Sequence, residues 1–493
     1  MERSPKILEK QLYDIWLQQD FCDPLTTVSG EEVVVLDTGG VFPDTSGPDF
    51  KNARIRIGNL TYVGDIEIDT DYTDWKAHGH SIDNKYNKIV LHACLHNKYD
   101  QPFVYTKDGR KVHTIILSDY IDHSKLEHLE EKVTAVESSN SHFLRCAESV
   151  VDVDYKIKEK FLAELGFLRL DKKCKRIYSR LKELKYLKEM HIKEPVMGYE
   201  LTKEIDEQEF SHSDFQEKEL WEQLFYEMIF EALGYSKNKN IMLQVAQSAD
   251  VSFLKKLGLD DQFTERVESA LFHIGGLIPE KKEFPDSVIE KYVNKLDDHW
   301  NNIRRIYDGE IYDETQWHFF KLRPQNFPTI RIAGGTRIVK EILYGNLLSV
   351  FIKKISEIRN FNVLINILRS ILVVKSDGFW KYHYVFNKPA TSEIKYFVGV
   401  SRADEMIINV VLPFFAVYFD IFGDEPLGKK VLKLYGFFQQ KSENKIVHEV
   451  AENLAVLNLT KKTVYQQGMI ELFRNYCSKG KCLECEIGKL VFS

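Results

Sequence analysis

The spacing of the apolar residues changes once along this chain, and this change limits the fold more than any other feature. Through about residue 120, short apolar runs end at glycine-containing turns, as β-strands and hairpins do. From about Ile121 onward, apolar residues recur every three or four residues with few turn signals, as in amphipathic helices. We therefore predict an α+β protein. It has an α/β domain at residues 1–135 with a mixed or mostly antiparallel sheet, a large all-α region at 136–475 and a cysteine-rich tail at 476–493.

Within the first part, the pattern predicts one helix followed by several strands. Lys6–Gln19 has the apolar spacing of a short amphipathic helix. Gly58 and Asn59 have the composition of a two-residue hairpin turn, which would pair Ile57 with Leu60. The predicted strands are Leu25–Val28, Val33–Leu36, Ala53–Ile57, Thr61–Asp69, Lys88–Leu95, Phe103–Thr106 and Val112–Leu117.

The composition argues against several classes of protein. The chain has 67 basic and 74 acidic side chains, and its net charge of −7 argues against coating nucleic acid through a broad basic surface. The N-terminus lacks the apolar run of a signal peptide, and the longest apolar stretch, Met406–Phe419, is too short to span a bilayer. Cysteines without a secretion signal indicate a reducing compartment. We expect a cytoplasmic protein without membrane contact.

Segments spread over nearly the whole chain resemble one protein family. They are Gly47–Ile55, Gly64–Ile68, Asp74-Trp75, His78-Gly79-His80, Leu91-His92, Trp221-Glu222, Ala232–Tyr235, Arg323–Pro328, Arg331–Ala333, Asn409-Val410, Gln467-Gly468, Tyr476-Cys477 and Cys482–Gly488. In these segments the chain resembles the bacterial "domain of unknown function 2851" family, found mainly in the Bacteroidetes. The resemblance implies no activity, because the family has none assigned. One departure is Glu67-Ile68-Asp69, where the family usually reads Glu-Ile-His.

Three carboxylates fall on the predicted hairpin. Asp49 precedes its first strand, and Glu67 and Asp69 are two residues apart on its second, so the latter two share a face. With Ile57 opposite Leu60, Asp49 would lie opposite Ile68 and away from that face. A one-residue bulge between Pro48 and Ala53 would bring Asp49 to the other two carboxylates, and Pro48 makes such irregularity plausible.

An aspartate followed by a Glu-x-polar pair resembles the core of the PD-(D/E)XK nuclease superfamily, which has a restriction-endonuclease-like fold. The resemblance implies that Asp49 and Glu67 bind Mg²⁺, a hard cation that prefers oxygen ligands. Asp69 stands where the superfamily usually has lysine. Similar members use Glu-x-Asp with a downstream histidine and aspartate, which here are His80 and Asp83. The catalytic set implied is therefore Asp49, Glu67, Asp69, His80 and Asp83.

Two alternatives for these residues remain open. Lys76 or Lys85 would take the lysine role in a working nuclease site. In a purely structural interpretation, Asp49 caps a turn, Glu67 faces solvent on its strand, and the histidines of the following loop bond to backbone.

The C-terminal cysteines have the spacing of metal ligands. Cys477, Cys482 and Cys485 form a C-x4-C-x2-C pattern, which suits Zn²⁺ or an iron–sulfur cluster with a fourth ligand. The pattern resembles the cluster loop of helix-hairpin-helix DNA glycosylases, whose further cysteine is missing here. Cys146 is the fourth ligand implied by the family resemblance, and some iron–sulfur nucleases similarly combine one distant cysteine with three close ones. Three reduced thiols in a mobile tail are the alternative.

The function predicted from these motifs is that of a metal-dependent, nuclease-like protein that acts on or binds nucleic acid, as a Mg²⁺-dependent phosphodiesterase. The competing prediction is a non-enzymatic scaffold or interaction protein with a degenerate nuclease fold and a structural metal site. The absent lysine favours the scaffold, whereas the carboxylates and histidines favour the enzyme.

Overall fold

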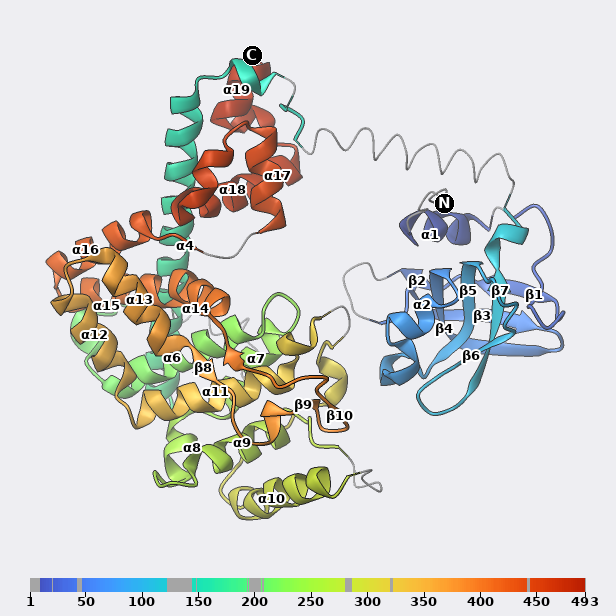
Figure 1. Ribbon diagram of the computed structural model, residues 1–493, viewed down its shortest axis with the longest axis horizontal. Coiled ribbons are helices and arrows are strands. Elements are labelled where there is room, and N and C mark those ends of the chain that lie inside the picture. Colours follow the sequence, from blue (N-terminus) through green and yellow to red (C-terminus); the bar gives the residue numbers. More distant parts are fainter. Residues whose placement is uncertain are drawn as a thin grey trace. The chain divides into compact units, whose positions relative to one another are not determined.

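The computed structural model divides the chain into two compact units, Met1–Ser141 and His142–Ser493 (Figure 1). The residues that it describes are 9–19, 21–41, 47–121, 144–147, 149–192, 194, 205, 208–279, 286–319, 322–440 and 444–492. The predicted boundary at residue 135 lies outside these residues. A mixed sheet in the first unit and a helical second unit confirm the α+β class. Among the described residues, no helix is both long and apolar enough to cross a membrane.

The first unit is built on a seven-stranded mixed sheet in the order β1-β3-β4-β5-β7-β6, with β2 also paired to β3. β4 runs antiparallel to β3 and parallel to β5, β5 runs parallel to β7, and β6 is antiparallel to β7. Its elements are α1 (Glu9–Gln18), β1 (Val33–Asp37), β2 (Gly40–Val41), β3 (Phe50–Ile57), β4 (Leu60–Asp71), α2 (Asp74–Ala77), β5 (Ile89–His96), β6 (Phe103–Tyr105) and β7 (Lys111–Ile116).

Two sequence predictions for this unit need comment. The predicted strand Leu25–Val28 is wrong, because only an isolated bridge between Thr26 and Glu32 forms there. The predicted helix is confirmed over α1, and the preceding residues 6–8 lie outside the described part.

β3 contains a bulge of the kind that would bring Asp49 toward Glu67. Pairing follows the two-residue turn from Ile57 opposite Leu60 as far as Ala53 opposite Gly64, but Phe50 then lies opposite Ile66. The register has therefore slipped by one residue between Phe50 and Ala53. Asn52 absorbs the slip with a positive φ of 57°, a conformation that asparagine tolerates better than most residues. The backbone N–H of Asn52 donates to Asp65 Oδ1 at 3.0 Å instead of to a carbonyl group of the neighbouring strand.

The two faces of the sheet are covered by different segments. Ile66 and Ile68 of β4 pack on one face with Leu12 and Trp16 of α1 in an apolar core. On the opposite face, a second core contains Trp75 of α2 together with side chains from β5, β6 and β7. Because side chains alternate along a strand, Glu67 and Asp69 point to this second face.

The second unit consists mainly of helices, and in the 35-residue α4 an apolar seam of Leu170, Ile177, Leu181 and Leu184, spaced as the helical period predicts, is buried in the core. Its helices are α4 (Tyr155–Glu189), α6 (Lys218–Leu233), α7 (Lys239–Ser248), α8 (Val251–Lys256), α9 (Phe263–Ile274), α10 (Ser287–Ile303), α11 (Pro328–Leu343), α12 (Leu347–Glu357), α13 (Phe361–Leu372), α14 (Val400–Met406), α15 (Leu412–Ile421), α16 (Glu425–Phe437), α17 (Lys445–Asn453), α18 (Thr463–Asn475) and α19 (Glu486–Phe492). The short strands β8 (Val374–Lys375), β9 (His383–Val385), β10 (Lys388–Pro389) and β11 (Tyr396–Val398) form two small hairpin-like pairs that the sequence did not predict.

A buried lysine lies where this unit departs from regular helix. A π-helical turn, Ile407–Val411, joins α14 to α15 and carries Asn409. The Lys173 ammonium group on α4 donates to Asn409 Oδ1 at 2.7 Å and to Gln467 Oε1 at 2.9 Å. Part of the lysine reaches solvent, but its ammonium group is enclosed, and this burial lowers the pKa of Lys173 to about 7.

We expect Lys173 to make the second unit more stable by about 2 kcal/mol when the pH rises from about 7 to about 9. The pKa of Lys173 lies below that of a lysine in an unfolded chain. Between these two values the unfolded state binds more protons, so raising the pH favours the folded state. Arg169 also lowers this pKa, whereas Glu405 and Glu471 oppose the shift. Urea unfolding at several pH values should show a smaller increase for Lys173→Met, and equal increases for the two proteins would contradict the prediction.

Candidate functional site

The bulge in β3 brings Asp49 beside Glu67. After the slip, the backbone N–H of Asp49 donates to Glu67 Oε2 at 3.2 Å. The Asp49 carboxylate accepts hydrogen bonds from the Ile68 N–H at 2.9 Å and from the Tyr13 hydroxyl of α1. The backbone of Asp49 therefore contacts Glu67, while its carboxylate ties the irregular start of β3 to β4 and to α1.

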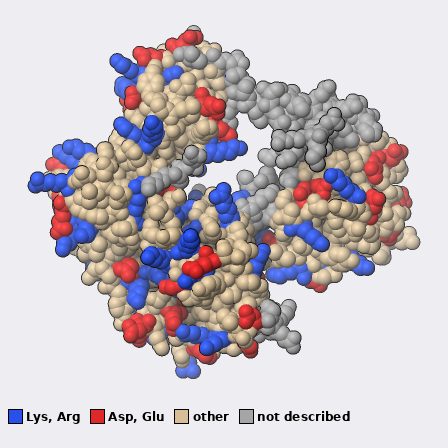
Figure 2. Space-filling model, in the orientation of Figure 1, with Lys and Arg blue, Asp and Glu red and all other residues tan. Residues whose placement is uncertain are grey.

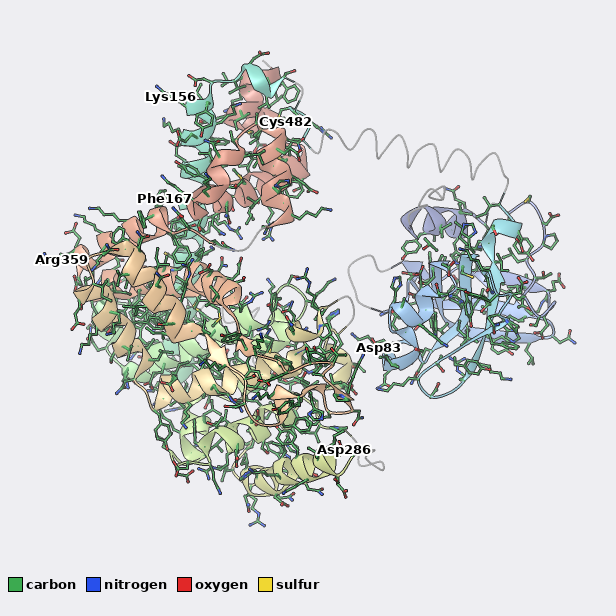
Figure 3. All side chains as sticks on the ribbon, viewed as in Figure 1. Asp83, Lys156, Phe167, Asp286, Arg359 and Cys482 are labelled. Atoms are coloured by element: carbon green, nitrogen blue, oxygen red, sulfur yellow. The ribbon has the colours of Figure 1, made fainter. Side chains whose placement is uncertain are left out.

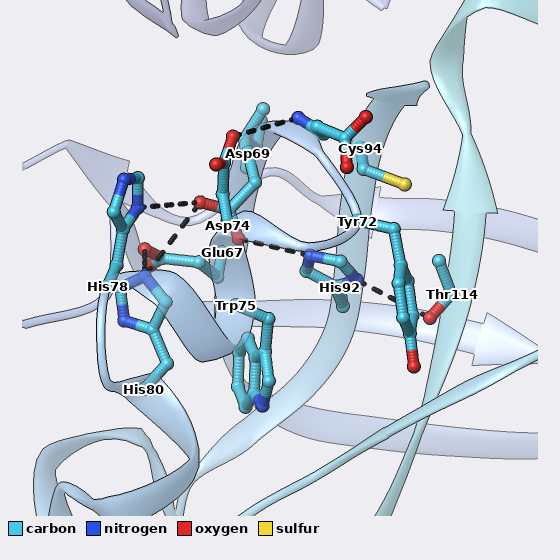
Figure 4. Close-up of polar contacts among 12 residues, drawn as sticks. Glu67, Asp69, Tyr72, Asp74, Trp75, His78, His80, His92, Cys94 and Thr114 are labelled. Atoms are coloured by element: carbon cyan, nitrogen blue, oxygen red, sulfur yellow. Dashed lines mark hydrogen bonds and ion pairs between the residues drawn. The ribbon is translucent and has the colours of Figure 1, made fainter. Parts of the chain in front are cut away.

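Asp69 is the centre of a cluster of buried polar side chains, which we call the carboxylate–histidine cluster (Figure 4). The cluster comprises Glu67, Asp69, His78, His80 and His92. Asp69 Oδ1 lies 3.3 Å from His78 Nδ1 and 3.8 Å from His80 Nε2, and Asp69 Oδ2 lies 3.1 Å from His92 Nε2. Glu67 Oε1 lies 3.2 Å from His80 Nε2. The two Asp69 oxygens thus face different histidines.

The segment after β4 holds His78 and His80 over the sheet. His78 ends α2, and Gly79 follows with a φ of 84°, which turns the chain into the short 3-10 helix His80–Ile82. Trp75 anchors the segment, because its indole N–H donates to the Tyr105 carbonyl at 3.1 Å and its ring packs on His80 with centroids 5.3 Å apart. The ring of Tyr86 covers His80 with centroids 4.1 Å apart.

His92 reaches the cluster from the neighbouring parallel strand. In the register of β4 and β5, His92 is the partner of Glu67. Its Nδ1 lies 3.4 Å from Thr114 Oγ1 on β7, and its Nε2 faces Asp69. Because a carboxylate only accepts, Nε2 must carry the proton in this contact. His92 therefore orients Asp69 from behind, as the outer partners of metal-binding carboxylates do.

The cluster favours the protonation states that metal binding needs. Burial by itself would raise the pKa of Asp69, but hydrogen bonds from His78, His80 and His92 outweigh it and hold that pKa well below its usual range. Burial lowers the pKa of His80, although Asp69 opposes the shift. At neutral pH Asp69 is thus an anion and His80 a neutral imidazole, the forms in which both groups bind metals.

Three side chains of the cluster can offer one ligand atom each to a single ion. These atoms, from Asp69, His78 and His80, all lie within 4.8 Å of one another. The His78 side chain is 25% exposed, whereas those of Asp69 and His80 are 1% exposed, so access from solvent is by way of His78. One oxygen and two imidazole nitrogens suit Zn²⁺, Fe²⁺ or Mn²⁺ better than Mg²⁺, which prefers oxygen alone.

The structure brings most of the predicted catalytic residues together. Glu67, Asp69 and His80 belong to the cluster, and Asp49 adjoins it through Glu67. The alternative in which Glu67 faces solvent is wrong, because its side chain is only 7% exposed. Asp83 instead accepts a hydrogen bond from the Lys85 N–H at 2.9 Å and caps the short 3-10 helix Asn84–Tyr86.

The sequence analysis did not assign His78 and His92 to the site. The His-Gly-His spacing after β4 was a usable signal for His78, because one intervening glycine lets both rings face the same carboxylate. His92 could have been found only from the parallel pairing of β4 with β5, which places it opposite Glu67. That pairing joins strands separated by a long connection and is not readable from local pattern.

The fold and the site together define an α+β protein that carries a buried carboxylate–histidine cluster on one face of a mixed sheet. The chain belongs to the family described as protein of unknown function (DUF2851), whose model matches residues 9–192 and 203–445. No curated protein and no solved structure matches the chain. The matched ranges include the whole cluster and Cys146, whereas Cys477, Cys482 and Cys485 lie beyond them.

Proposed function

We propose that the carboxylate–histidine cluster binds a divalent metal ion and hydrolyses phosphodiester bonds in nucleic acid. The observation that carries the proposal is the one-residue slip in β3, which sets the Asp49 backbone against the carboxylate of Glu67, a member of the cluster. Without the slip, Asp49 would lie opposite Ile68 and away from the cluster. A costly backbone irregularity at this point is typical of functional sites.

The metal ion would supply the central chemistry when bound, as a Lewis acid for the scissile phosphate and an activator of water. Asp69, His78 and His80 would hold it. The Glu67 carboxylate lies beside His80 Nε2, one of these ligand atoms, so it would orient a water molecule or accept its proton. His92 would hold Asp69 in place from the far side. The ligand set favours Mn²⁺, Zn²⁺ or Fe²⁺, and Mg²⁺ remains the ion implied by the nuclease resemblance.

Two lysines support a phosphate ester as the substrate. Lys85 follows Asp83 and precedes Tyr86, whose ring covers His80. Burial lowers the pKa of Lys85, the negative charge of Asp83 opposes this shift, and the positive charge of Lys51 on β3 adds to it. Lysine side chains beside the cluster favour an anionic substrate such as a phosphodiester. Lys85 would thus supply the cation that the usual nuclease lysine provides. On the face drawn in Figure 2, basic and acidic side chains are interspersed, which favours such local contacts over a broad basic surface.

A scaffold with a structural metal site is the second candidate. One observation favours it: Asp49, the first residue of the implied nuclease set, accepts hydrogen bonds from Tyr13 and from the Ile68 N–H. In this second candidate, the role of Asp49 is purely structural, because its hydrogen bonds tie the start of β3 to β4 and to α1.

A cleavage assay distinguishes the two candidates. The full chain is incubated with labelled single- and double-stranded DNA and RNA in Mn²⁺, Zn²⁺, Fe²⁺ or Mg²⁺, and bound metal is measured in parallel. We expect metal-dependent cleavage by the wild type. Glu67→Gln should reduce its rate about 100-fold or more, because the carboxylate that handles the water is lost. His78→Ala should also lose metal, because it removes a ligand.

His96→Ala is the matched control, since His96 is an exposed histidine at the end of β5 outside the cluster. It should cleave like the wild type. Metal binding without cleavage of any of these substrates would favour the scaffold, and absence of both would contradict a metal site in the cluster.

A further inference from the structure

Four cysteines of the second unit gather at one end of it, although more than 300 residues separate the first from the rest. Cys146 lies in the segment 144–147 ahead of α4. Cys477 and Cys482 begin the short 3-10 helices η11 (Cys477–Lys479) and η12 (Cys482–Glu484), and Cys485 stands between η12 and α19. Figure 3 marks this end of the unit by Cys482 and by Lys156, near the start of α4.

Ordinary contacts bring the tail back onto the start of the unit. The Leu144 N–H donates to Asn453 Oδ1 at 3.2 Å, and the rings of Phe161 and Tyr476 meet edge to face with centroids 6.2 Å apart. Cys485 is buried in the small apolar core of this end, and Cys146 and Cys477 pack against it. The tail is therefore an ordered part of the unit and not a separate extension.

The loop that carries the C-terminal cysteines is shaped by two glycines. Gly480 has a φ of 66°, and the Arg145 guanidinium lies 3.5 Å from where its Cβ would be. A Cβ on Gly488 would lie 2.1 Å from the Cys482 carbonyl oxygen. These glycines let the loop curl tightly and bring it against Arg145, the residue before Cys146.

The four cysteines lie close together in the fold. Cys485, Cys146 and Cys477 border the same small apolar core, and the Cys485 N–H donates to the Cys482 carbonyl at 3.2 Å. Cys485 also accepts hydrogen bonds from the Ile487 and Gly488 backbone N–H groups, as metal-bound thiolates do. Burial raises the pKa of Cys146 and of Cys477, and the neighbouring thiols add to both shifts.

The spacing of the sulfurs is too wide for one ion. Four sulfurs bound at about 2.3 Å to one tetrahedral Zn²⁺ would lie about 3.8 Å apart. Among the described residues, only Asp69, His78 and His80 offer three ligand atoms within 4.8 Å of one another, so no three of these thiols are that close. A four-iron cluster binds each thiolate through a different iron and therefore suits thiols that surround a wider space.

We propose that Cys146, Cys477, Cys482 and Cys485 bind a four-iron, four-sulfide cluster that fastens the C-terminal tail to the segment ahead of α4. The site goes beyond the phosphodiesterase proposed for the first unit and does not depend on it. Its role is structural: the cluster joins two distant stretches of chain around a small core, as metal sites do where apolar burial is limited.

The test is the metal content of the full chain purified without oxygen. We expect about four iron and about four acid-labile sulfide per chain, with broad visible absorbance that bleaches on reduction by dithionite. Apo protein incubated with ferrous iron and sulfide should regain the same content. Zinc in place of iron and sulfide would overturn the cluster, and a chain that holds neither, even after reconstitution, would overturn the metal site.

Serine variants assign the ligands. Cys146→Ser should lose most of the iron although it lies outside the C-terminal motif, and Cys482→Ser should do the same. Cys174→Ser is the matched control, because Cys174 is a half-buried thiol of the same unit that packs on the main helical core and donates to the Pro413 carbonyl at 3.7 Å. It should keep the full cluster. Circular dichroism checks that each variant is folded, and full iron in folded Cys146→Ser would exclude Cys146 and overturn the proposal.

Discussion

Replacing Asp69 with asparagine is expected to destabilise the sheet of the first unit by about 3 kcal/mol and to abolish metal binding to the carboxylate–histidine cluster. The carboxylate faces His92 Nε2 at 3.1 Å and His78 Nδ1 at 3.3 Å. An amide has one acceptor oxygen and carries no charge, so the charge-assisted hydrogen bonds of the carboxylate to the rings are lost and only one ring N–H keeps an acceptor. Because the loss concerns the fold itself, it should be present in metal-free protein.

Hydrogen–deuterium exchange in increasing urea is the suitable measurement, because a chain of two units need not unfold in one step. Peptides from β4 and β5 should exchange at lower urea in Asp69→Asn than in the wild type. Asp71→Asn is the control: it makes the same chemical change two residues along β4, where the side chain is half-buried and bonds to Thr73. Equal effects of the two substitutions would contradict a special role for Asp69.

Replacing Gly468 with alanine is expected to destabilise the crossing of α4 and α18 by about 3 kcal/mol. A Cβ on Gly468 would lie 1.9 Å from the Leu162 carbonyl oxygen, and one on Gly166 would lie 2.1 Å from the Val464 carbonyl oxygen. The two helix backbones thus approach through a pair of glycines, and the atoms in the way are backbone atoms that cannot swing aside. The helices must separate, which opens the core on both sides.

Hydrogen–deuterium exchange of peptides from α4 and α18 in increasing urea measures this loss of stability. Gly428→Ala is the control. Gly428 lies within α16, and a Cβ added there would have the Cβ of Phe419 as its neighbour, at an ordinary distance of 3.9 Å. That change should be neutral or stabilise the protein by about 0.5–1 kcal/mol, since glycine is a poor helix former. If Gly468→Ala changes the stability no more than Gly428→Ala does, the conclusion that α4 and α18 approach closely through these glycines is wrong.

The candidate site was predictable to the extent that it depends on one hairpin. The turn at Gly58 and Asn59 sets the register of β3 and β4, and from it followed that only a bulge ahead of Ala53 would bring Asp49 to Glu67. Whether that bulge forms was left open. His78 and His92 escaped prediction because the contacts that bring them to Asp69 pass through a connecting segment and a parallel strand. Such contacts depend on the packing of Trp75 and Tyr86 and leave little local trace.

The sequence by itself determined the α+β class, the hairpin that carries Glu67 and Asp69, and the apolar seam of α4, since each depends on interactions between neighbours in the chain. Only the tertiary structure decided which side chains share a site. It set His92 beside Asp69, and it brought Cys146 to the cysteines near the C-terminus, more than 300 residues later in the sequence. The physical reason is that long-range contacts are selected by the total free energy of packing, which local periodicity does not contain.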